Sequence, residues 1–421
     1  MNEKNLDFIT FGCKLNMFES EIMREKAIEH GLENITFFNT CAVTNEAIRQ
    51  ARQRIRKEKR NYPNKRIIVT GCAAQLHPEE FNEMDEVDFI IGNQEKTLSK
   101  TYEDLKNNVL SIPSIKVTDI MEVRETSSHL LKSFGSKTRA FVEVQNGCDH
   151  RCTFCIIPYA RGNSRSVPAN HVIKQIKNLV ATGYSEIVLT GVDITSYGKG
   201  LDDNINLSKL IALIIKDIPD LKRLRISSID SIEIDQEFID IFVSEKKIMP
   251  HLHLSIQSGD NLILKRMKRR HLAEHTLEFC QKIRELRGET VFGADIITGF
   301  PTETDEMFKN TKEHIDNCNL TYLHIFPFSA KKGTPAEKMP QIQNNIIKKR
   351  ATELRKLGSL KLDSFLEEQI GQSHEILVEK NGFGRTEQYC EVNFNGNYNQ
   401  GEIITGLIKS VNQNKLNAKI I

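Results

Sequence analysis

The feature that most constrains this 421-residue chain is a short loop with three cysteines. The stretch GCDHRCTFC holds Cys148, Cys152 and Cys155 in the spacing C-x3-C-x2-C, directly after a predicted strand over Ala140–Val144. Three thiolates on one short loop hold three corners of a 4Fe–4S cube and leave the fourth iron without a protein ligand. A cofactor that carries an amino and a carboxylate group can chelate that open iron.

A structural zinc site is the alternative for this loop. Zinc prefers C-x2-C pairs and four protein ligands. His150 lies inside the loop, but no further Cys or His follows at a suitable spacing. The spacing therefore favours an iron–sulfur cluster over zinc.

The rest of the composition indicates a reducing compartment. Nine cysteines in 421 residues are too few for a disulfide scaffold. The first ten residues lack the apolar core of a secretory signal, and no run of 18 apolar residues predicts a membrane span. We therefore expect a cytoplasmic protein with no membrane partner.

A second set of cysteines is spread over the first segment. Cys13, Cys41 and Cys72 each follow a predicted strand by one to three residues. The three strands are expected over Leu6–Phe11, Ile35–Phe38 and Arg66–Thr70, with helices over Glu19–His30 and Asn45–Arg60 and a further strand over Asp88–Ile91. This alternation predicts a doubly wound parallel sheet, whose carboxyl strand ends gather at one rim. The spacing predicts a second three-thiol metal site there, with three separate buried thiols as the alternative.

Two further segments follow. Six candidate strands alternate with helical patterns and predict a (βα)-type partial barrel with its site at the carboxyl strand ends. They cover Ala140–Val144, Glu186–Leu189, Arg223–Ile226, His251–Ile256, Phe292–Ile297 and Tyr322–Phe326. Short strands after Phe365, punctuated by Gly and Asn, predict a small antiparallel β-barrel. The expected α/β organisation is 1–116 for the sheet domain, 117–138 for a linker, 139–365 for the barrel and 366–421 for the small β-barrel.

Charge is concentrated in the middle of the chain. Residues 131–365 contain 35 basic and 28 acidic residues, an excess of seven in a chain whose net charge is +2. Two basic runs stand out, Arg49–Arg60 and Lys265–Arg270. Either run fits nucleic-acid phosphates, and either also fits a solvated helix face.

The cysteine loop resembles that of the radical S-adenosylmethionine (SAM) enzymes, which carry an aromatic residue before the last cysteine. Phe154 occupies that position, and the resemblance implies that it packs near the adenine of SAM. The resemblance also implies SAM contacts at the strand ends that carry Thr190, Gly191, Asp193, Ser228 and Gln257. Polar residues after a strand are also ordinary turn formers, and Phe154 also fits a core aromatic.

Nearly the whole chain resembles the methylthiotransferases, which insert sulfur into an unactivated C–H bond. Matching stretches are GCKLN, NTCAVTNEA, VTGCAAQ, NGCDHRCTFCIIPYARGNSRS, LSIQSGDNLILKRMKRRH, ADIITGFPTET and FPFSAKKGTPA. The resemblance implies two 4Fe–4S clusters, two SAM molecules per turnover and a TRAM-like C-terminal barrel. This sequence departs from the family pattern at Lys331-Lys332, where the family more often has Arg-Pro. We expect that difference to affect a loop.

The stretches around Cys41 and Lys265–Arg270 are similar to the branch that modifies N6-threonylcarbamoyladenosine in tRNA. The expected reaction transfers a methylthio group to C2 of that base, beside the anticodon. The resemblance implies a tRNA anticodon stem-loop, an external low-potential electron donor and a sulfur donor as partners. Isopentenyladenosine in tRNA and an aspartate of a ribosomal protein are the alternative substrates, and an iron–sulfur carrier or RNA-binding module is the non-enzymatic alternative.

Five cations are candidates for substrate or RNA contact. Threonylcarbamoyl carries a carboxylate, which a bidentate arginine fits well. The candidates are Arg161, Arg165, Lys268, Arg269 and Arg270. Phosphate or SAM-carboxylate contact is an equal alternative for Arg161 and Arg165.

Overall fold

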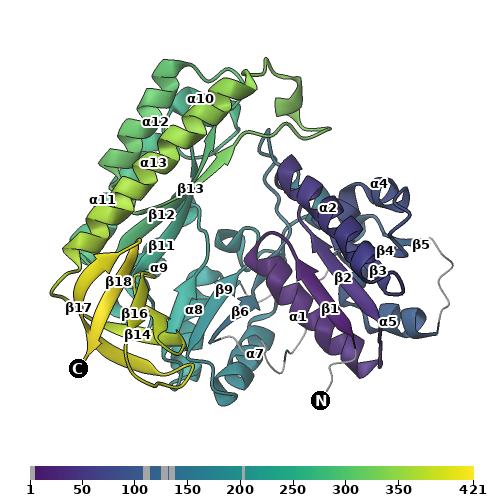
Figure 1. Ribbon diagram of the computed structural model, residues 1–421. Helices are drawn as coiled ribbons and strands as arrows, with labels where there is room; N and C mark the ends of the chain where they lie inside the picture. Colours follow the sequence, from purple (N-terminus) through teal and green to yellow (C-terminus); the bar gives the residue numbers. More distant parts are fainter. Residues whose placement is uncertain (1–4, 108–113, 125–130, 132–137, 202–203) are drawn as a thin grey trace.

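The computed structural model describes residues 5–107, 114–124, 131, 138–201 and 204–421 (Figure 1). An N-terminal sheet domain, a central partial barrel and a small closed barrel follow one another along the chain. The expected α/β fold class with its three parts is confirmed, with one departure in the strand pairing of the small barrel.

The N-terminal domain is a five-stranded parallel sheet in the order β1-β2-β3-β4-β5. The strands are β1 (Leu6–Thr10), β2 (Ile35–Thr40), β3 (Arg66–Gly71), β4 (Phe89–Ile91) and β5 (Ser114–Lys116). Helices α1 (Lys14–Glu29) and α5 (Ser99–Lys106) pack on one face, while α2 (Asn45–Asn61), α3 (Cys72–Leu76) and α4 (Pro78–Asn82) pack on the other. The sheet is therefore covered on both faces, as the alternating pattern predicted.

Helix α1 is buried on two sides. Leu15 and Phe18 join the core of the central barrel, whereas Met23 and Ala27 pack against the domain's own sheet. The helix begins at Lys14, five residues before the expected start. Two apolar faces weaken the single-stripe pattern from which helix ends are predicted. Figure 1 shows α1 between β1 and the strands β6 and β9 of the barrel.

Six strands form the central partial barrel, as predicted. The first three, β6 (Arg139–Glu143), β9 (Glu186–Thr190) and β10 (Arg223–Ile226), and the last three, β11 (His251–Gln257), β12 (Val291–Thr298) and β13 (Tyr322–Pro327), make two parallel sheets. Parallel bridges between Leu224 and Ile248 and between Ile229 and Leu254 join the two sheets. The helices that follow the strands are α7 (Ala169–Ala181), α8 (Leu207–Asp217), α9 (Gln236–Ser244), α10 (Asn261–Arg266), α11 (Ala273–Leu286), α12 (Asp305–Asn317) and α13 (Asn344–Glu368).

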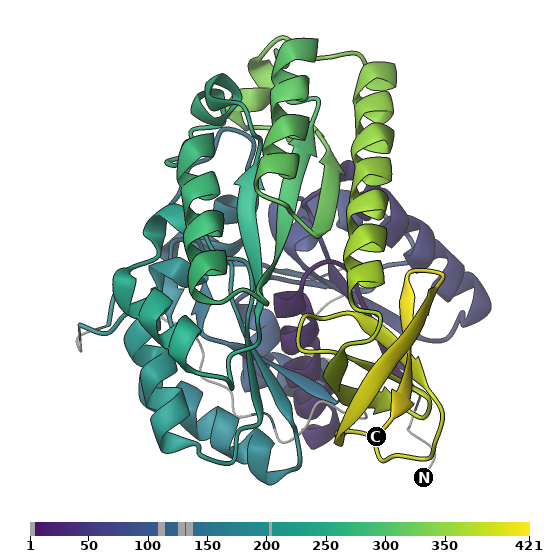
Figure 2. The same cartoon turned by 90° about the vertical axis from the view of Figure 1, so that its left-hand side faces the viewer.

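A closed β-barrel ends the chain. Its strands are β14 (Ser373–Lys380), β15 (Phe383–Arg385), β16 (Glu391–Phe394), β17 (Ile403–Asn412) and β18 (Lys415–Ile420), in the order β14-β15-β16-β18-β17. The pairing of β16 with β18 is parallel, whereas the pattern predicted antiparallel strands only. Figure 2 shows the long helix α13 running down to this barrel.

The closed barrel covers the amino ends of the central strands. Arg223 of β10 donates to the carbonyl of Glu375 at 2.9 Å, and the Tyr322 hydroxyl of β13 donates to the carbonyl of Gln388 at 3.0 Å. The guanidinium group of Arg225 lies over the ring of Tyr389 in this contact. The carboxyl ends of the central strands are therefore the open ends.

The expected domain bounds stay a prediction. Strand β5 ends at Lys116, but residues 125–130 and 132–137 of the expected linker lie outside the described residues. Among the described residues, none of the helices has the length and apolar character needed to cross a membrane.

Candidate functional site

The loop with three cysteines lies at the carboxyl end of β6. It runs from the short strand β7 (Gln145–Asn146) to helix α6 (Ile157–Arg161), and the Cys148 N–H donates to the carbonyl of Gly162 at 3.1 Å. Gly147 has φ +71°, and a Cβ there would lie 2.0 Å from the Asn163 carbonyl oxygen. Only glycine fits this turn, which aims Cys148 into the barrel mouth.

The three thiols of this loop lie within electrostatic range of one another. Burial raises the pKa of Cys155 to about 12, with a further contribution from Cys152, and burial also raises the pKa of Cys148. Metal binding must therefore release these protons, as in other thiolate sites. Arg269 lies beside the set, with Nη1 3.7 Å from the Cys152 sulfur, and favours the deprotonated thiols. Three sulfurs on one loop with an adjacent cation fit the three-cornered cluster predicted from the spacing.

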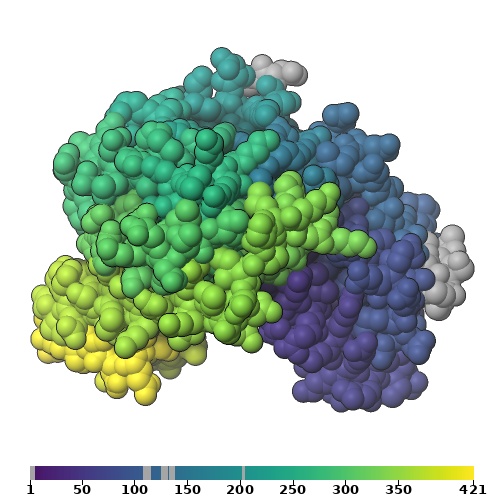
Figure 3. All heavy atoms as spheres, turned by 90° about the horizontal axis from the view of Figure 1, so that it is seen from above, coloured from purple at the N-terminus to yellow at the C-terminus, as the bar shows by residue number. Residues whose placement is uncertain are grey.

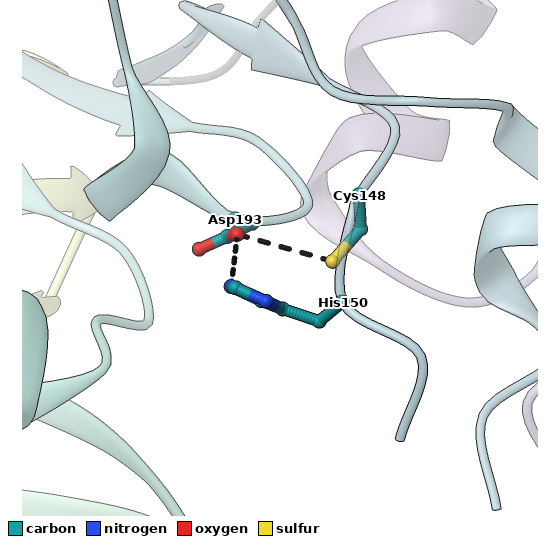
Figure 4. Close-up of side chains that lie close together, drawn as sticks. All are labelled: Cys148, His150 and Asp193. Atoms are coloured by element: carbon teal, nitrogen blue, oxygen red, sulfur yellow. Dashed lines mark hydrogen bonds and ion pairs between the residues drawn. The ribbon is translucent and has the colours of Figure 1, made fainter. Parts of the chain in front are cut away.

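Figure 4 shows the contacts of Cys148 with the neighbouring strand end. The Cys148 sulfur lies 3.8 Å from Asp193 Oδ2, and His150 Nε2 lies 3.0 Å from the same oxygen. Hydrogen bonds to Asp193 and Glu233 raise the pKa of His150 to about 9. Arg270 Nη2 also lies 2.7 Å from His150 Nε2, so charged side chains of the protein already engage this ring nitrogen. The cysteine spacing, and not the protonation of His150, favours an iron–sulfur cluster over zinc, because Cys148, His150 and Asp193 also offer three ligand atoms close together.

The predicted SAM contacts after β9 adjoin the cysteine loop. Thr190 ends β9, and the N–H groups of Val192 and Asp193 both donate to Gln145 Oε1, at 3.0 and 2.8 Å. A Cβ on Gly191 would lie 2.6 Å from the Gln145 carbonyl oxygen, so glycine is needed there. The geometry brings this strand end to the cysteine loop, and SAM contact by these residues stays a prediction.

The other predicted SAM contacts come from three separate elements. Gln257 ends β11 with φ +70°, after a register shift against β12. Ser228 follows β10 and is partly buried. Phe154 packs edge-on against Phe300, with ring centroids 6.4 Å apart. The core interpretation of Phe154 thus has a structural basis, and its predicted contact with adenine remains untested.

The spread cysteines converge at the rim of the N-terminal sheet. Cys13 precedes α1 and is exposed, whereas Cys41 directly follows β2 and Cys72 begins α3, both buried. Gly71 has φ +93°, and a Cβ there would lie 2.3 Å from the Thr40 carbonyl oxygen. This tight turn brings Cys72 beside Cys41. Burial, then the neighbouring thiols of Cys72 and Cys13, raise the pKa of Cys41 to about 11.

Three buried cations surround this second set. Arg161 of α6 interacts electrostatically with Cys72 and Cys13, Lys96 with Cys72, and Lys331 with Cys41. Buried cations favour deprotonated thiols, as metal ligation requires. The set therefore has the chemistry of a second metal centre.

Lys331 marks the departure from the family pattern at Lys331-Lys332. It is 6% exposed, and its Nζ donates to Asn45 Oδ1 at 2.9 Å. Asn45 begins α2, so this loop of the barrel joins the N-terminal domain beside Cys41. The departure lies in a loop, as expected, but that loop borders the candidate second centre.

The predicted substrate and RNA cations fall into two groups. Arg161 and Arg165 are 2% and 7% exposed; Arg161 pairs with Glu19, and Arg165 donates to the Arg161 carbonyl at 2.9 Å. Lys268 is exposed and makes no ion pair with any residue that the structure describes. Contact of these residues with substrate or RNA stays a prediction. Of Arg161, Arg165 and Lys268, only Lys268 presents its cation to solvent.

Arg269 and Arg270 turn toward the cysteine loop. Arg269 Nη2 donates to Asp230 Oδ2 at 2.8 Å, and Arg270 pairs with Glu233. The basic helix α2 is similarly engaged, because nearby acidic residues pair with five of its cations, Arg49, Arg52, Arg54, Arg56 and Lys59. Basic runs in the sequence thus overstate the free positive charge on the surface.

Several residues at the site were not found from the sequence. Glu143 ends β6, and burial, with Glu19 adding to it, raises its pKa to about 7. Lys96 Nζ lies 2.6 Å from Glu19 Oε2, and both are buried. These partners come from distant segments, so no spacing in the sequence relates them. Such perturbed groups are frequent at functional sites.

Comparisons with protein families match two parts of the chain. Residues 142–315 match the radical SAM superfamily, and residues 5–92 match the uncharacterized protein family UPF0004. The first region holds the cysteine loop and most of the barrel strands. The second holds Cys13, Cys41 and Cys72.

Curated relatives match nearly the whole chain. The threonylcarbamoyladenosine tRNA methylthiotransferase MtaB of Rickettsia prowazekii is 51% identical over 391 residues, which cover 93% of this chain and 91% of the relative. The protein of the same name from Bacillus subtilis is 36% identical and covers 92% and 90%. The tRNA-2-methylthio-N(6)-dimethylallyladenosine synthase of Rickettsia canadensis is 32% identical and covers 99% of both chains.

Solved structures share the fold at low identity. The radical SAM methyltransferase TsrM of Kitasatospora setae has a TM-score of 0.59 at 13% identity, covering 79% of this chain and 75% of its own. A likeness at this identity concerns the fold only. It agrees with a radical SAM barrel in the centre of the chain.

Proposed function

Since this chain belongs to the radical SAM methylthiotransferase family and is a tRNA methylthiotransferase, we propose that its substrate is N6-threonylcarbamoyladenosine beside the anticodon. The product is then 2-methylthio-N6-threonylcarbamoyladenosine. The observation that carries this proposal is the 51% identity to a relative named for that base, against 32% for a synthase named for dimethylallyladenosine. The iron–sulfur carrier is set aside, because the family consists of enzymes.

The proposal includes two 4Fe–4S clusters, one on Cys148, Cys152 and Cys155 and one on Cys13, Cys41 and Cys72. Together with SAM, the bound clusters supply a carbon radical strong enough to remove hydrogen from adenine C2 and the sulfur that replaces it. The proposal is supported by Arg161 of α6, the helix after the cysteine loop, which interacts electrostatically with Cys72 and Cys13 and pairs with Glu19 of the N-terminal domain. Two SAM molecules are used in each turnover.

The chain's own side chains bind and orient the reactants. We assign SAM to the strand ends that carry Thr190, Gly191, Asp193, Ser228 and Gln257, next to Phe154. The surrounding barrel excludes water, which protects a reactive carbon centre from stray hydrogen donors. Exposed cations, with Lys268 the clearest, hold the phosphates of the anticodon loop, whose base is splayed into the site. The electron donor and the sulfur donor are external proteins or small molecules, and the proposed compartment is the cytoplasm.

The test offers the reconstituted enzyme, with SAM and a strong reductant, two anticodon stem-loops that differ only in the modification at N6. Mass spectrometry of the nucleosides should find methylthio addition on the threonylcarbamoyl substrate. Addition to the isopentenyl substrate alone would overturn the assignment and leave the family intact. A stem-loop without either modification is the matched control. If a ribosomal-protein peptide alone is modified, the RNA substrate itself is wrong.

A further inference from the structure

One buried amide lies between the two domains that carry the cysteine sets. Asn93 follows β4 and is buried, and its Nδ2 atom lies 3.9 Å from the Cys72 sulfur. The same nitrogen donates to the carbonyl of Ala160 in α6 at 2.7 Å. An amide nitrogen has two hydrogens, so both bonds form at once. Asn93 therefore joins a cysteine of the N-terminal domain to the helix that follows the cysteine loop of the barrel.

The orientation of this amide is fixed by its other contacts. Lys96 Nζ donates to Asn93 Oδ1 at 2.7 Å, and the Asn93 backbone N–H donates to Gln75 Oε1 of α3 at 2.8 Å. An ammonium group only donates, so the amide oxygen has to face it. A flipped amide would instead bring that oxygen against the Ala160 carbonyl. The nitrogen is therefore the atom that faces the Cys72 sulfur.

The barrel also holds Asn93 by a second route. Arg161, the residue after Ala160, pairs with Glu19, and Lys96 Nζ lies 2.6 Å from Glu19 Oε2. All three charged side chains are buried. Docking of α6 thus provides the acceptor for the amide nitrogen of Asn93, and through Glu19 it also holds the cation that faces the amide oxygen.

Helices α3 and α6 pack directly against each other around the Cys72 sulfur. Cys72 and Ala73 of α3 share one apolar core with Ile156 and Ala160. Figure 3 shows the N-terminal domain, in purple and blue, seated against the central barrel. Cys72 is 3% exposed, so water does not replace Asn93 as a donor to this sulfur.

The cysteine loop of the barrel takes its polar contact from its own domain instead. Arg269 Nη1 lies 3.7 Å from the Cys152 sulfur, and Arg269 Nη2 donates to Asp230 at 2.8 Å. All three residues belong to the barrel. The contact between Asn93 and Cys72 differs, because its anchor, the Ala160 carbonyl, lies in the other domain.

A hydrogen bond to a cysteine sulfur acts on the metal that the sulfur binds. An N–H group that faces the sulfur favours the thiolate over the thiol, and bonds to a charged acceptor are shorter and stronger than neutral ones. Hydrogen bonds to the sulfurs of an iron–sulfur cluster help to set its reduction potential. Partners behind a metal ligand also hold the ligand in place.

We propose that Asn93 is a positioning residue for the second cluster, on which it acts through a hydrogen bond to the Cys72 sulfur that is anchored on α6 of the barrel. The barrel thereby influences the reduction potential and the retention of a cluster whose cysteines all lie in the N-terminal domain. The inference rests on the proposed function, because it needs the cluster on Cys13, Cys41 and Cys72.

The first test measures the reduction potential of the second cluster by redox titration with electron paramagnetic resonance. The full-length triple alanine variant at Cys148, Cys152 and Cys155 isolates that cluster. Asn93→Leu removes the donor at similar size, whereas Asn93→Asp keeps the acceptor for Lys96 but turns an oxygen toward the sulfur. Both changes should lower the potential, and Asn93→Asp should lower it further, because a carboxylate adds negative charge. Asn178→Asp, at an exposed position on α7, is the matched control and should leave the potential unchanged.

The second test measures retention of iron by the reconstituted holoenzyme. The chelator concentration that removes the first four irons should fall by roughly 10-fold or more in Asn93→Leu, which is the usual effect of losing the partner of a metal ligand. Asn178→Asp should retain iron like the wild type. Thermal unfolding of each variant is measured in parallel.

The outcomes separate this inference from the proposed function. If Asn93 had only a structural role, its variants would unfold at lower temperature while the potential stayed unchanged, and that result would overturn the inference. An unchanged potential and unchanged iron retention in both variants, with about eight irons in the wild type, would also overturn it and leave the proposed function intact. A wild-type protein with only four irons would instead overturn the two clusters of the proposed function.

Discussion

Arg161 and Glu19 form a bidentate ion pair across 142 residues of sequence, with Nη1 to Oε1 at 2.8 Å and Nη2 to Oε2 at 3.0 Å. Arg161 belongs to the helix after the radical-type cysteine loop, and Glu19 belongs to α1 of the N-terminal domain. Both are 2% exposed. The pair therefore ties together the two domains that carry the candidate clusters.

Arg161→Met should strongly destabilise the protein. Removing one partner leaves Glu19 buried with only Lys96 to compensate it, a change that costs about 3–5 kcal/mol. Urea unfolding of the apo protein measures this cost. Arg49→Met removes a cation that pairs with Glu46 on the exposed surface of α2, and it should leave the midpoint essentially unchanged. Equal effects of the two variants would contradict a special role for the buried pair.

The stabilising effect of Glu19 should disappear in acid. Although burial opposes it, Arg161 and Lys96 lower the pKa of Glu19 to about 2, below the ordinary 4.5. A carboxyl group with a lowered pKa in the folded state stabilises it above the unfolded pKa, and this stability is lost as pH falls. The difference in unfolding free energy between wild type and Glu19→Gln should thus shrink from about pH 4.5 toward pH 2. A difference that grows on acidification would show that the sign is wrong.

Iron content should separate the two cysteine sets. The anaerobically reconstituted protein should hold about eight irons, and the triple alanine variant at Cys148, Cys152 and Cys155 should keep about half of them. Cys390→Ala changes a buried cysteine outside both sets and should leave the iron content intact. Complete loss of iron in the triple variant would count against two independent sites.

Cys13→Ala should divide the reaction into two parts. The cysteine loop of the barrel has its own ligands in another domain, so cleavage of SAM to 5′-deoxyadenosine should survive while sulfur insertion is lost. Cys148→Ala should abolish both. Chromatography of the nucleosides measures the two products together. If Cys13→Ala no longer forms 5′-deoxyadenosine under strong reductant, the two sites do not have separate roles.

Lys268→Glu should weaken tRNA binding. Each phosphate contact contributes to the salt dependence, so the slope of log affinity against log salt should fall by about 1 or more. Lys246→Glu, in an exposed position before the amino end of β11, is the control. Arg269→Glu should act differently, because Arg269 pairs with Asp230 beside Cys152 and its loss should disturb SAM cleavage. An unchanged salt slope for Lys268→Glu would place the RNA elsewhere.

The agreement between sequence and fold is best where the signal is local. The strand expected over Arg223–Ile226 was found with the same bounds, because its sequence RLRI alternates arginine with leucine and isoleucine, which is the two-residue period of a strand. The start of α1 was missed by five residues, because Leu15 packs on the barrel while Met23 packs on the sheet. A helix that packs against two cores shows no single apolar stripe in its sequence. The basic runs overstated the free positive charge for a related reason. Their acidic partners, such as Asp230 for Arg269, lie in other segments of the chain.

The sequence by itself determined the order of the elements and the places of the six clustered cysteines. Those follow from short-range spacing and from the rule that parallel strands end at one rim. Only the tertiary structure decided that Arg161 pairs with Glu19, and that His253 and His324 both contact Asp295. Such pairs depend on strand register and on how two domains meet. An ion pair across 142 residues leaves no periodic trace in either segment, because its geometry exists only after the chain has folded.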